Sequence, residues 1–228
     1  MRITTGVLGA VTGSALCASF AAAQTCLGRP YFSTAPVHVG AIADFGGDVS
    51  AIGVEGGYGK ARSYFVKGHA VRAQVNGGAV TSTTDPAGMT FNATGGMQFA
   101  FGKRSHGQFC PLVTGSMGNV ELTNGNTLER SEIGVGGSFG FVHTSNAGFH
   151  LVPYVGLSVA QLDRRIDPPG AADVNLGTET YYPLTGGVGM HFENSFAVIA
   201  NLTFPLELPS ADPVFGLRMT VPVGGRRR

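Results

Sequence analysis

The sequence predicts an all-β protein, a closed antiparallel up-and-down transmembrane β-barrel of about ten strands, with eight also possible. Three observations favour this fold. Apolar and polar residues alternate over long stretches, glycine accounts for 36 of the 228 residues, and charged residues make up only 13% of the chain. Soluble domains average about 7% glycine and about 25% charged residues. The formal net charge of +1 indicates no general attraction for nucleic acid.

The alternation is clearest in residues 89–101, MTFNATGGMQFAF, where phenylalanine and methionine fall on one face and threonine, asparagine and glutamine on the other. A period of two over this length indicates a strand about twice as long as usual. Turn-forming residues separate similar stretches. The predicted strands lie near residues 36–45, 49–60, 63–77, 88–102, 109–122, 129–143, 148–162, 179–193, 195–205 and 213–223.

The apolar face of these strands is predicted to point outward, toward lipid. Near the C-terminus Phe215, Leu217 and Met219 alternate with Gly216 and Arg218. Strands this long and this poor in charge would give a soluble protein a thin polar surface, whereas a membrane barrel requires an apolar exterior. The inward face is expected to carry an ion-pair network that fills the lumen; the alternative is the lining of a narrow channel. Its candidate members are Glu55, Lys67, His69, Glu132 and Arg218.

The N-terminus predicts export from the cytoplasm. Residues 1–23 combine a positive start, an apolar stretch and the Ala21-Ala22-Ala23 sequence that signal peptidase accepts. The barrel domain then comprises residues 24–228, with a short periplasmic segment at 24–35 and an arginine-rich tail at 224–228. Cleavage leaves Cys26 and Cys110, which in an oxidising compartment most simply form one disulfide; two unpaired buried thiols are the alternative.

The connections predict which end of the barrel faces outward. If the mature N-terminus is periplasmic, connections alternate between outside and inside, and the outer ones are longer. Residues 78–87, 163–178 and 206–212 form the long outer connections in this scheme, and the charges around Asp163 are then solvated loop residues. Tyr181 and Tyr182, at the start of the next strand, are expected to anchor the barrel at the membrane interface.

The signal peptide, the strands rich in glycine and aromatic residues, the long outer loops and the terminal strand FGLRMTVPV resemble the small outer-membrane β-barrel proteins of the OmpA/OmpX/OmpW type. The resemblance covers the whole mature chain. It implies residence in the outer membrane of a Gram-negative cell, where outer-membrane lipid and the barrel-assembly machinery are the partners. It leaves the partner of the outer loops open.

Residues 143–148, HTSNAG, resemble the His-x-Ser-Asn-Ala-Gly segment of the outer-membrane lipid A deacylases, in which histidine and serine form a nucleophile pair. That chemistry needs an acidic group to orient the imidazole and a site at the outer leaflet. No Asp or Glu follows before Asp163, and the predicted topology puts His143 and Ser145 in a periplasmic turn. Ser-Asn-Ala-Gly is also ordinary turn chemistry.

The sequence therefore predicts a non-enzymatic outer-membrane barrel with a structural or surface-interaction role through its outer loops and a lumen filled by side chains. No cofactor or metal site is expected, because no cysteine or histidine spacing suits zinc. The alternatives are a lipid A acyl hydrolase that uses His143 and Ser145, and a narrow, porin-like passive channel.

Overall fold

The computed structural model describes residues 27–28, 36–47, 49–60, 63–75, 87–101, 107–121, 126–144, 149–170, 172–192, 196–208 and 211–224. The predicted signal peptide 1–23, Cys26, Ser145 and the tail beyond residue 224 lie outside these residues. Within the described part of the chain, no helix is long and apolar enough to cross a membrane.

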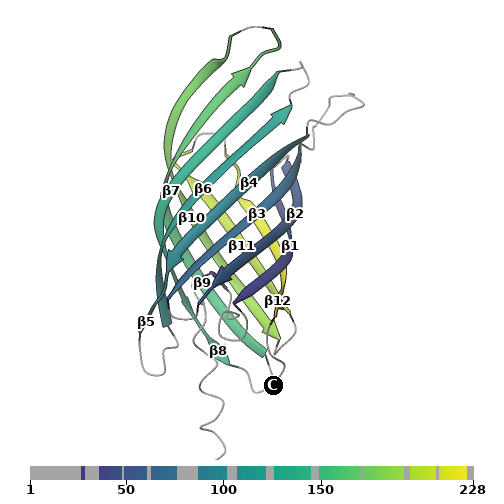
Figure 1. Ribbon diagram of the computed structural model, residues 1–228. Coiled ribbons are helices and arrows are strands. Elements are labelled where there is room, and N and C mark those ends of the chain that lie inside the picture. The colour runs from purple at the N-terminus through teal and green to yellow at the C-terminus, as the bar shows by residue number, and fades with distance from the viewer. Residues whose placement is uncertain are drawn as a thin grey trace, which may run out of the picture.

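One antiparallel sheet closes on itself to form a barrel (Figure 1). Its strands follow the alternating stretches of the sequence. Their bounds are β1 Val37–Gly46, β2 Val49–Gly59, β3 Tyr64–Val75, β4 Ala87–Met97, β5 Phe99–Phe101, β6 Gly107–Glu121, β7 Thr127–Phe141, β8 His143–Thr144, β9 Phe149–Asp167, β10 Val174–Phe192, β11 Ala197–Leu206 and β12 Val214–Val223.

The barrel has ten strand positions around its circumference, as predicted from the sequence. Neighbours along the chain pair in turn, and β1 closes the sheet by pairing with β12, from Val37 opposite Val223 to Phe45 opposite Phe215. The short strands β5 and β8 follow β4 and β7 after a one-residue interruption and pair with the same neighbours, β6 and β9. They therefore continue existing strand positions and add none.

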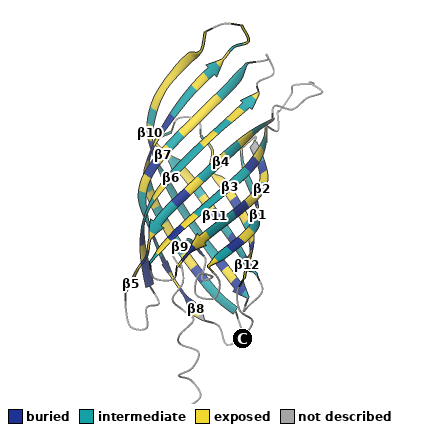
Figure 2. Cartoon of the chain, in the orientation of Figure 1, coloured by how far each residue is buried: buried dark blue, intermediate teal, exposed yellow. Residues whose placement is uncertain are grey.

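Exposed and buried residues alternate along the strands (Figure 2). On β2 the side chain of Val54 is 65% exposed, whereas that of its neighbour Glu55 is 5% exposed. On β12, Leu217 and Met219 are exposed, while Thr220 is buried. The prediction that the apolar face points outward and the polar face inward is confirmed, because a period of two in sequence becomes the two faces of the barrel wall.

Glycine lines the concave inner face where neighbouring strands approach most closely. A Cβ atom added to the inward-facing Gly53 would collide with the carbonyl oxygen of Ala70, and one added to Gly88 would collide with that of Asn119. The outward-facing Gly68 has more room: an added Cβ there would lie 3.4 Å from the nearest atom, the carbonyl oxygen of Asn92. The high glycine content thus permits the tight curvature of the wall.

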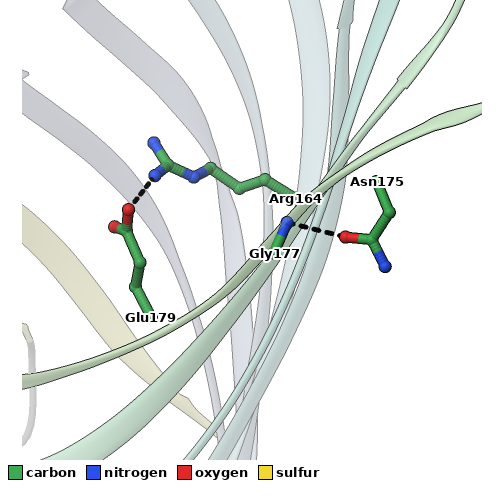
Figure 3. A network of polar contacts seen from close by, with 4 residues as sticks. All are labelled: Arg164, Asn175, Gly177 and Glu179. Carbon is green, nitrogen blue, oxygen red and sulfur yellow. Dashed lines mark hydrogen bonds and ion pairs between the residues drawn. The ribbon is translucent and has the colours of Figure 1, made fainter.

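The β9–β10 hairpin is longer than the sequence predicted, and it projects beyond the neighbouring strands at the end away from the C-terminus (Figure 1). The prediction that residues 163–178 form a loop was wrong: β9 continues to Asp167, and β10 begins at Val174. The charged residues are compatible with a strand because they are paired. Arg164 on β9 binds Glu179 on β10 at 2.6 Å (Figure 3), and Arg165 binds Asp163 at 3.3 Å.

Crowding of the inner face leads to a test of stability. We expect Gly53→Ala to lower the free energy of unfolding by about 1–3 kcal/mol, because the added methyl group forces neighbouring strands apart. Gly68→Ala, on the outer face of the next strand, is the control and should change it by less than about 0.5 kcal/mol. The chain has no tryptophan, so the folded fraction is best followed in urea by the difference in gel mobility between folded and unfolded protein. Equal effects of the two variants would contradict this account.

Candidate functional site

The lumen contains a cavity of about 440 Å³, bounded by residues from all the main strands except β2. Among the lining residues are Lys67, His69, Glu132 and Arg218, four of the five lumen residues predicted from the sequence. The fifth, Glu55, is buried on the inward face of β2. All five lie on the inward face, because each alternates along its strand with outward-facing residues. That they form one ion-pair network stays a prediction.

The first group of charges lies where β12 meets β1. Asp44, which the sequence analysis did not single out, interacts electrostatically with Arg218, Glu55 and Lys67. Gly216 makes room for this group: an added Cβ there would lie 2.7 Å from carboxylate oxygen Oδ1 of Asp44 and 2.7 Å from amide oxygen Oδ1 of Asn201. Acidic and basic side chains in equal number thus face one another inside the wall, where an unpaired charge would be costly.

The second group lies on the opposite wall and centres on Glu132 of β7. Arg130, two residues earlier on the same face, binds the Glu132 carboxylate at 2.7 Å. The hydroxyl group of Tyr181 on β10 interacts with both. Tyr181 is only 5% exposed and packs with Ala160, Leu162 and Leu208. The prediction that Tyr181 anchors the barrel in the membrane interface was therefore wrong, because its position on β10 points inward.

The two-residue period of a strand could have identified two members of these groups, Asp44 and Arg130, that sequence reasoning missed. Asp44 follows the inward-facing Ile42 by two residues, and Arg130 precedes Glu132 by two. Each therefore shares the face of its partner. The interactions across the lumen need the closed barrel, because they join strands that are distant in the sequence.

Buried side chains fill the lumen at the end that carries the C-terminus. His38, Gln108, Val152 and Ile199 are each almost fully inaccessible to solvent. They come from β1, β6, β9 and β11, and therefore from different sides of the barrel. Below the charged groups, the interior of the described wall thus resembles a packed protein core.

Leu27 and Gly28, which the sequence places in a short periplasmic segment, lie within this packed end. Leu27 packs against Phe65, Cys110 and Leu112 on the inner wall. Gly28 has φ of 71° and its carbonyl oxygen touches β10 so closely that Gly189 could carry no side chain. The start of the described chain therefore adds its own side chain to the filling of the lumen.

Only one cysteine of the predicted disulfide, Cys110, lies among the described residues. Cys110 is fully buried, and its sulfur is not a free thiol. Cys26 lies outside the described residues, so its pairing with Cys110 stays a prediction. The position of Cys110 beside Leu27, the residue after Cys26, is compatible with that pairing.

Strand β8, which contains the candidate catalytic histidine His143, lies at the end of the barrel that carries the C-terminus (Figure 1). His143 lies in β8, opposite Leu151 of β9, and its side chain is exposed. Ser145 lies outside the described residues, so the geometry of a nucleophile pair is not established. In the described part of the chain, no group of three or more His, Cys, Asp or Glu side chains could hold a metal ion.

Comparison with known proteins supports the fold. No known protein family and no curated protein matches the sequence. Among solved structures, the chain is similar to the β domain of the Bordetella autotransporter BrkA, with a TM-score of 0.50 and 15% identity over 83% of this chain and 84% of that one. It is also similar to the N-terminal β-barrel domain of Pseudomonas aeruginosa OprF, with a TM-score of 0.36 and 13% identity over 81% and 94%. These similarities do not support the OmpA/OmpX/OmpW type in particular.

The Arg130–Glu132 pair, whose carboxylate also contacts the Tyr181 hydroxyl group, should contribute more to stability than the Asp163–Arg165 pair. We expect Glu132→Ala to cost about 1–3 kcal/mol of folding free energy, because Arg130 and the buried Tyr181 hydroxyl both lose an acceptor. Asp163→Ala breaks the exposed pair with Arg165 and should cost less than about 1 kcal/mol. Urea titration monitored by gel mobility would measure both. A larger loss for Asp163→Ala would show that the lumen cluster is not the stabilising one.

Proposed function

We propose that this protein is an outer-membrane β-barrel with a structural or surface-interaction role, whose lumen does not conduct. The observation that carries the proposal is the reversed distribution of polarity. The outward face is apolar on strands all round the barrel, whereas the charged residues of the wall's lower and middle part face the interior. A protein dissolved in water places these two classes the other way round.

The dimensions of the wall support a membrane span. The shortest main strands, β1, β11 and β12, have 10 residues each. A tilted strand of about 9–11 residues suffices to cross a bilayer. Backbone hydrogen bonding also favours this placement, because a closed barrel leaves few unpaired N–H and C=O groups in the hydrocarbon core.

Aromatic residues gather outside the packed end of the barrel, as they do where a membrane barrel crosses the lipid–water interface. Phe101, Phe139 and Phe141 form one cluster, with ring centroids 5.0 Å apart for Phe101 and Phe139 and 4.6 Å apart for Phe139 and Phe141. Tyr58 and Tyr64 form a second pair at 6.1 Å. These rings replace the tryptophans that the chain lacks.

The packed end supports a non-conducting lumen. Ions would have to pass Leu27, Phe65 and Ile199, which are held in contact with the wall or buried within it. Above them the cavity is lined by charges of both signs that interact with one another, which gives no selective path for either sign. The proposal places this packed end in the periplasm and the projecting β9–β10 hairpin at the cell surface.

The proposal assigns no catalytic role to His143 or Ser145. The periplasmic placement of β8 puts His143 away from the outer leaflet, where lipid A lies. The surface available to partners is instead the β9–β10 hairpin, whose charged residues lie beyond the ends of the neighbouring strands.

Membrane insertion is tested on one strand. Val135 and Glu129 share the outward face of β7, Val135 in its middle and Glu129 near its upper end. We expect Val135→Arg to reduce folding into lipid vesicles by about 2–4 kcal/mol, because it places a charge in the hydrocarbon. Glu129→Arg should change it little. Heat-dependent gel mobility after membrane fractionation measures the folded fraction; a chain that stays in solution without detergent contradicts the membrane placement.

The filled lumen is tested in planar bilayers. The unaltered chain should give a flat current trace. The double variant Phe65→Ala/Ile199→Ala removes two buried side chains from the packed end and should produce discrete current steps. Val135→Ala, on the outer face, is the control and should remain silent. Steps from the unaltered chain would favour a channel.

A further inference from the structure

The hydrogen-bond ladder of the barrel wall has one long gap among the described strands. β10 pairs with β9 along its whole length, from Val174 opposite Ile166 to Phe192 opposite Phe149. Its pairing with β11 begins only at Tyr182, opposite Leu206, because β11 ends there. Residues 174–181 of β10 therefore form a sheet edge with no strand beside it in the described structure.

The backbone groups on that edge can be identified from the paired part of the strand. The N–H of Phe192 donates to the carbonyl oxygen of Phe196 at 3.0 Å, so the backbone groups of Phe192 face the β11 side. Donors alternate sides along a strand, and the register with β9 does not shift between Gly177 and Phe192, although Tyr182 and Pro183 have no partner on β9. Every second residue counted back from Phe192 faces the same side. Thr178 and Thr180 therefore present their N–H and C=O groups at the edge.

The regular part of this edge carries no charged side chain that is without a partner. Thr178 and Thr180 are exposed and uncharged, and the carboxylate of Glu179 between them is bound by Arg164 (Figure 3). Above them a bulge at Asn175 and Gly177 ends the regular stretch, with the Gly177 N–H donating to Asn175 Oδ1 at 2.7 Å. Val174 and Leu176 beyond the bulge are about half exposed, at 51% and 47%.

The edge must lie outside the hydrocarbon core, because open sheet edges do not occur in contact with lipid. This step rests on the proposed membrane placement, which puts the hairpin at the cell surface. In water an uncovered edge readily pairs with another strand, and natural proteins protect such edges with charges, prolines or bulges. In the described part of the chain, the bulge at residues 175–177 and the inward-facing Glu179 are the protecting features, and the backbone from Thr178 to Tyr181 remains regular.

We propose that the edge of β10 at Thr178–Tyr181 binds an extended polypeptide segment of another protein by strand addition. Only a second strand offers donors and acceptors at the spacing of alternate residues, so the main chain would supply most of the affinity. The ligand's side chains would lie alternately beside the threonines on the outer face and beside the Arg164–Glu179 pair on the inner face. A second copy of the chain fits less well, because two copies inserted in the same direction would bring their β10 edges together as parallel strands, the less stable arrangement.

The test uses the full chain folded in detergent micelles and a labelled synthetic peptide, AQLDRRID, which copies the β9 residues 160–167 that already pair with the other side of this stretch. The peptide should bind, and binding should slow hydrogen exchange at the amides of Thr178 and Thr180. The variant Thr178→Pro/Thr180→Pro removes both donors and should weaken binding about tenfold. Thr178→Ala/Thr180→Ala keeps the donors and should bind within about twofold of the unaltered chain.

Two further measurements keep the test decisive. Hydrogen exchange is measured on the unaltered chain, so this measurement remains valid even if the proline variant fails to fold. If saturating peptide does not slow exchange at the amides of Thr178 and Thr180, the proposal is overturned. A dimer by light scattering whose formation the proline variant abolishes also overturns it, in favour of a second copy as the occupant. Neither result affects the heat-dependent gel mobility that tests membrane insertion.

Discussion

The structure depends on one constraint, the pairing of every strand with a neighbour on each side through the span. In the proposed membrane placement, an open sheet with these side chains would leave two edges of unpaired backbone groups beside lipid, where no water can satisfy them. Closing β12 onto β1 removes both edges. Closure in turn forces curvature, and curvature crowds the inner face. The inward glycines such as Gly53 and Gly88 follow from that crowding, as do the small polar side chains that share the lumen with the charged groups.

The interior then resolves into two regions of different physical character. Toward the C-terminal end, large side chains and Leu27 pack as in an ordinary core. Above them, the Asp44 and Glu132 groups keep opposite charges within reach of each other. Paired charges of this kind are tolerated because the attraction between the partners offsets part of the free energy that each loses when it leaves water. The barrel is thus held from inside by packing at one end and by ion pairs and hydrogen bonds further up.

Much of this architecture could be predicted from the sequence, because the side-chain period of a strand is the same in sequence and in space. Alternation located ten strands and assigned Val54 to the outer face and Glu55 to the inner face. The upper part of the β9–β10 hairpin could not be found in this way, since Asp163, Arg164 and Arg165 in a row have the composition of a loop. Their partners, such as Glu179 on the next strand, become visible only when the strands are aligned. The position of Leu27 inside the barrel leaves no periodic signal at all.

The place of Leu27 and Gly28 bears on the order of assembly. The residues that contact them come from β3, β6, β9 and β10. Leu27 packs against Phe65, Cys110 and Leu112. Gly28 lies against Tyr154 and Gly189. Most of these strands lie far downstream in the chain. The earliest described residues therefore have no binding surface until much of the wall exists. They reach this position either as β12 closes onto β1 or through the adjacent open end of the finished barrel. These two residues, made before every strand of the wall, would be among the last to reach their final position.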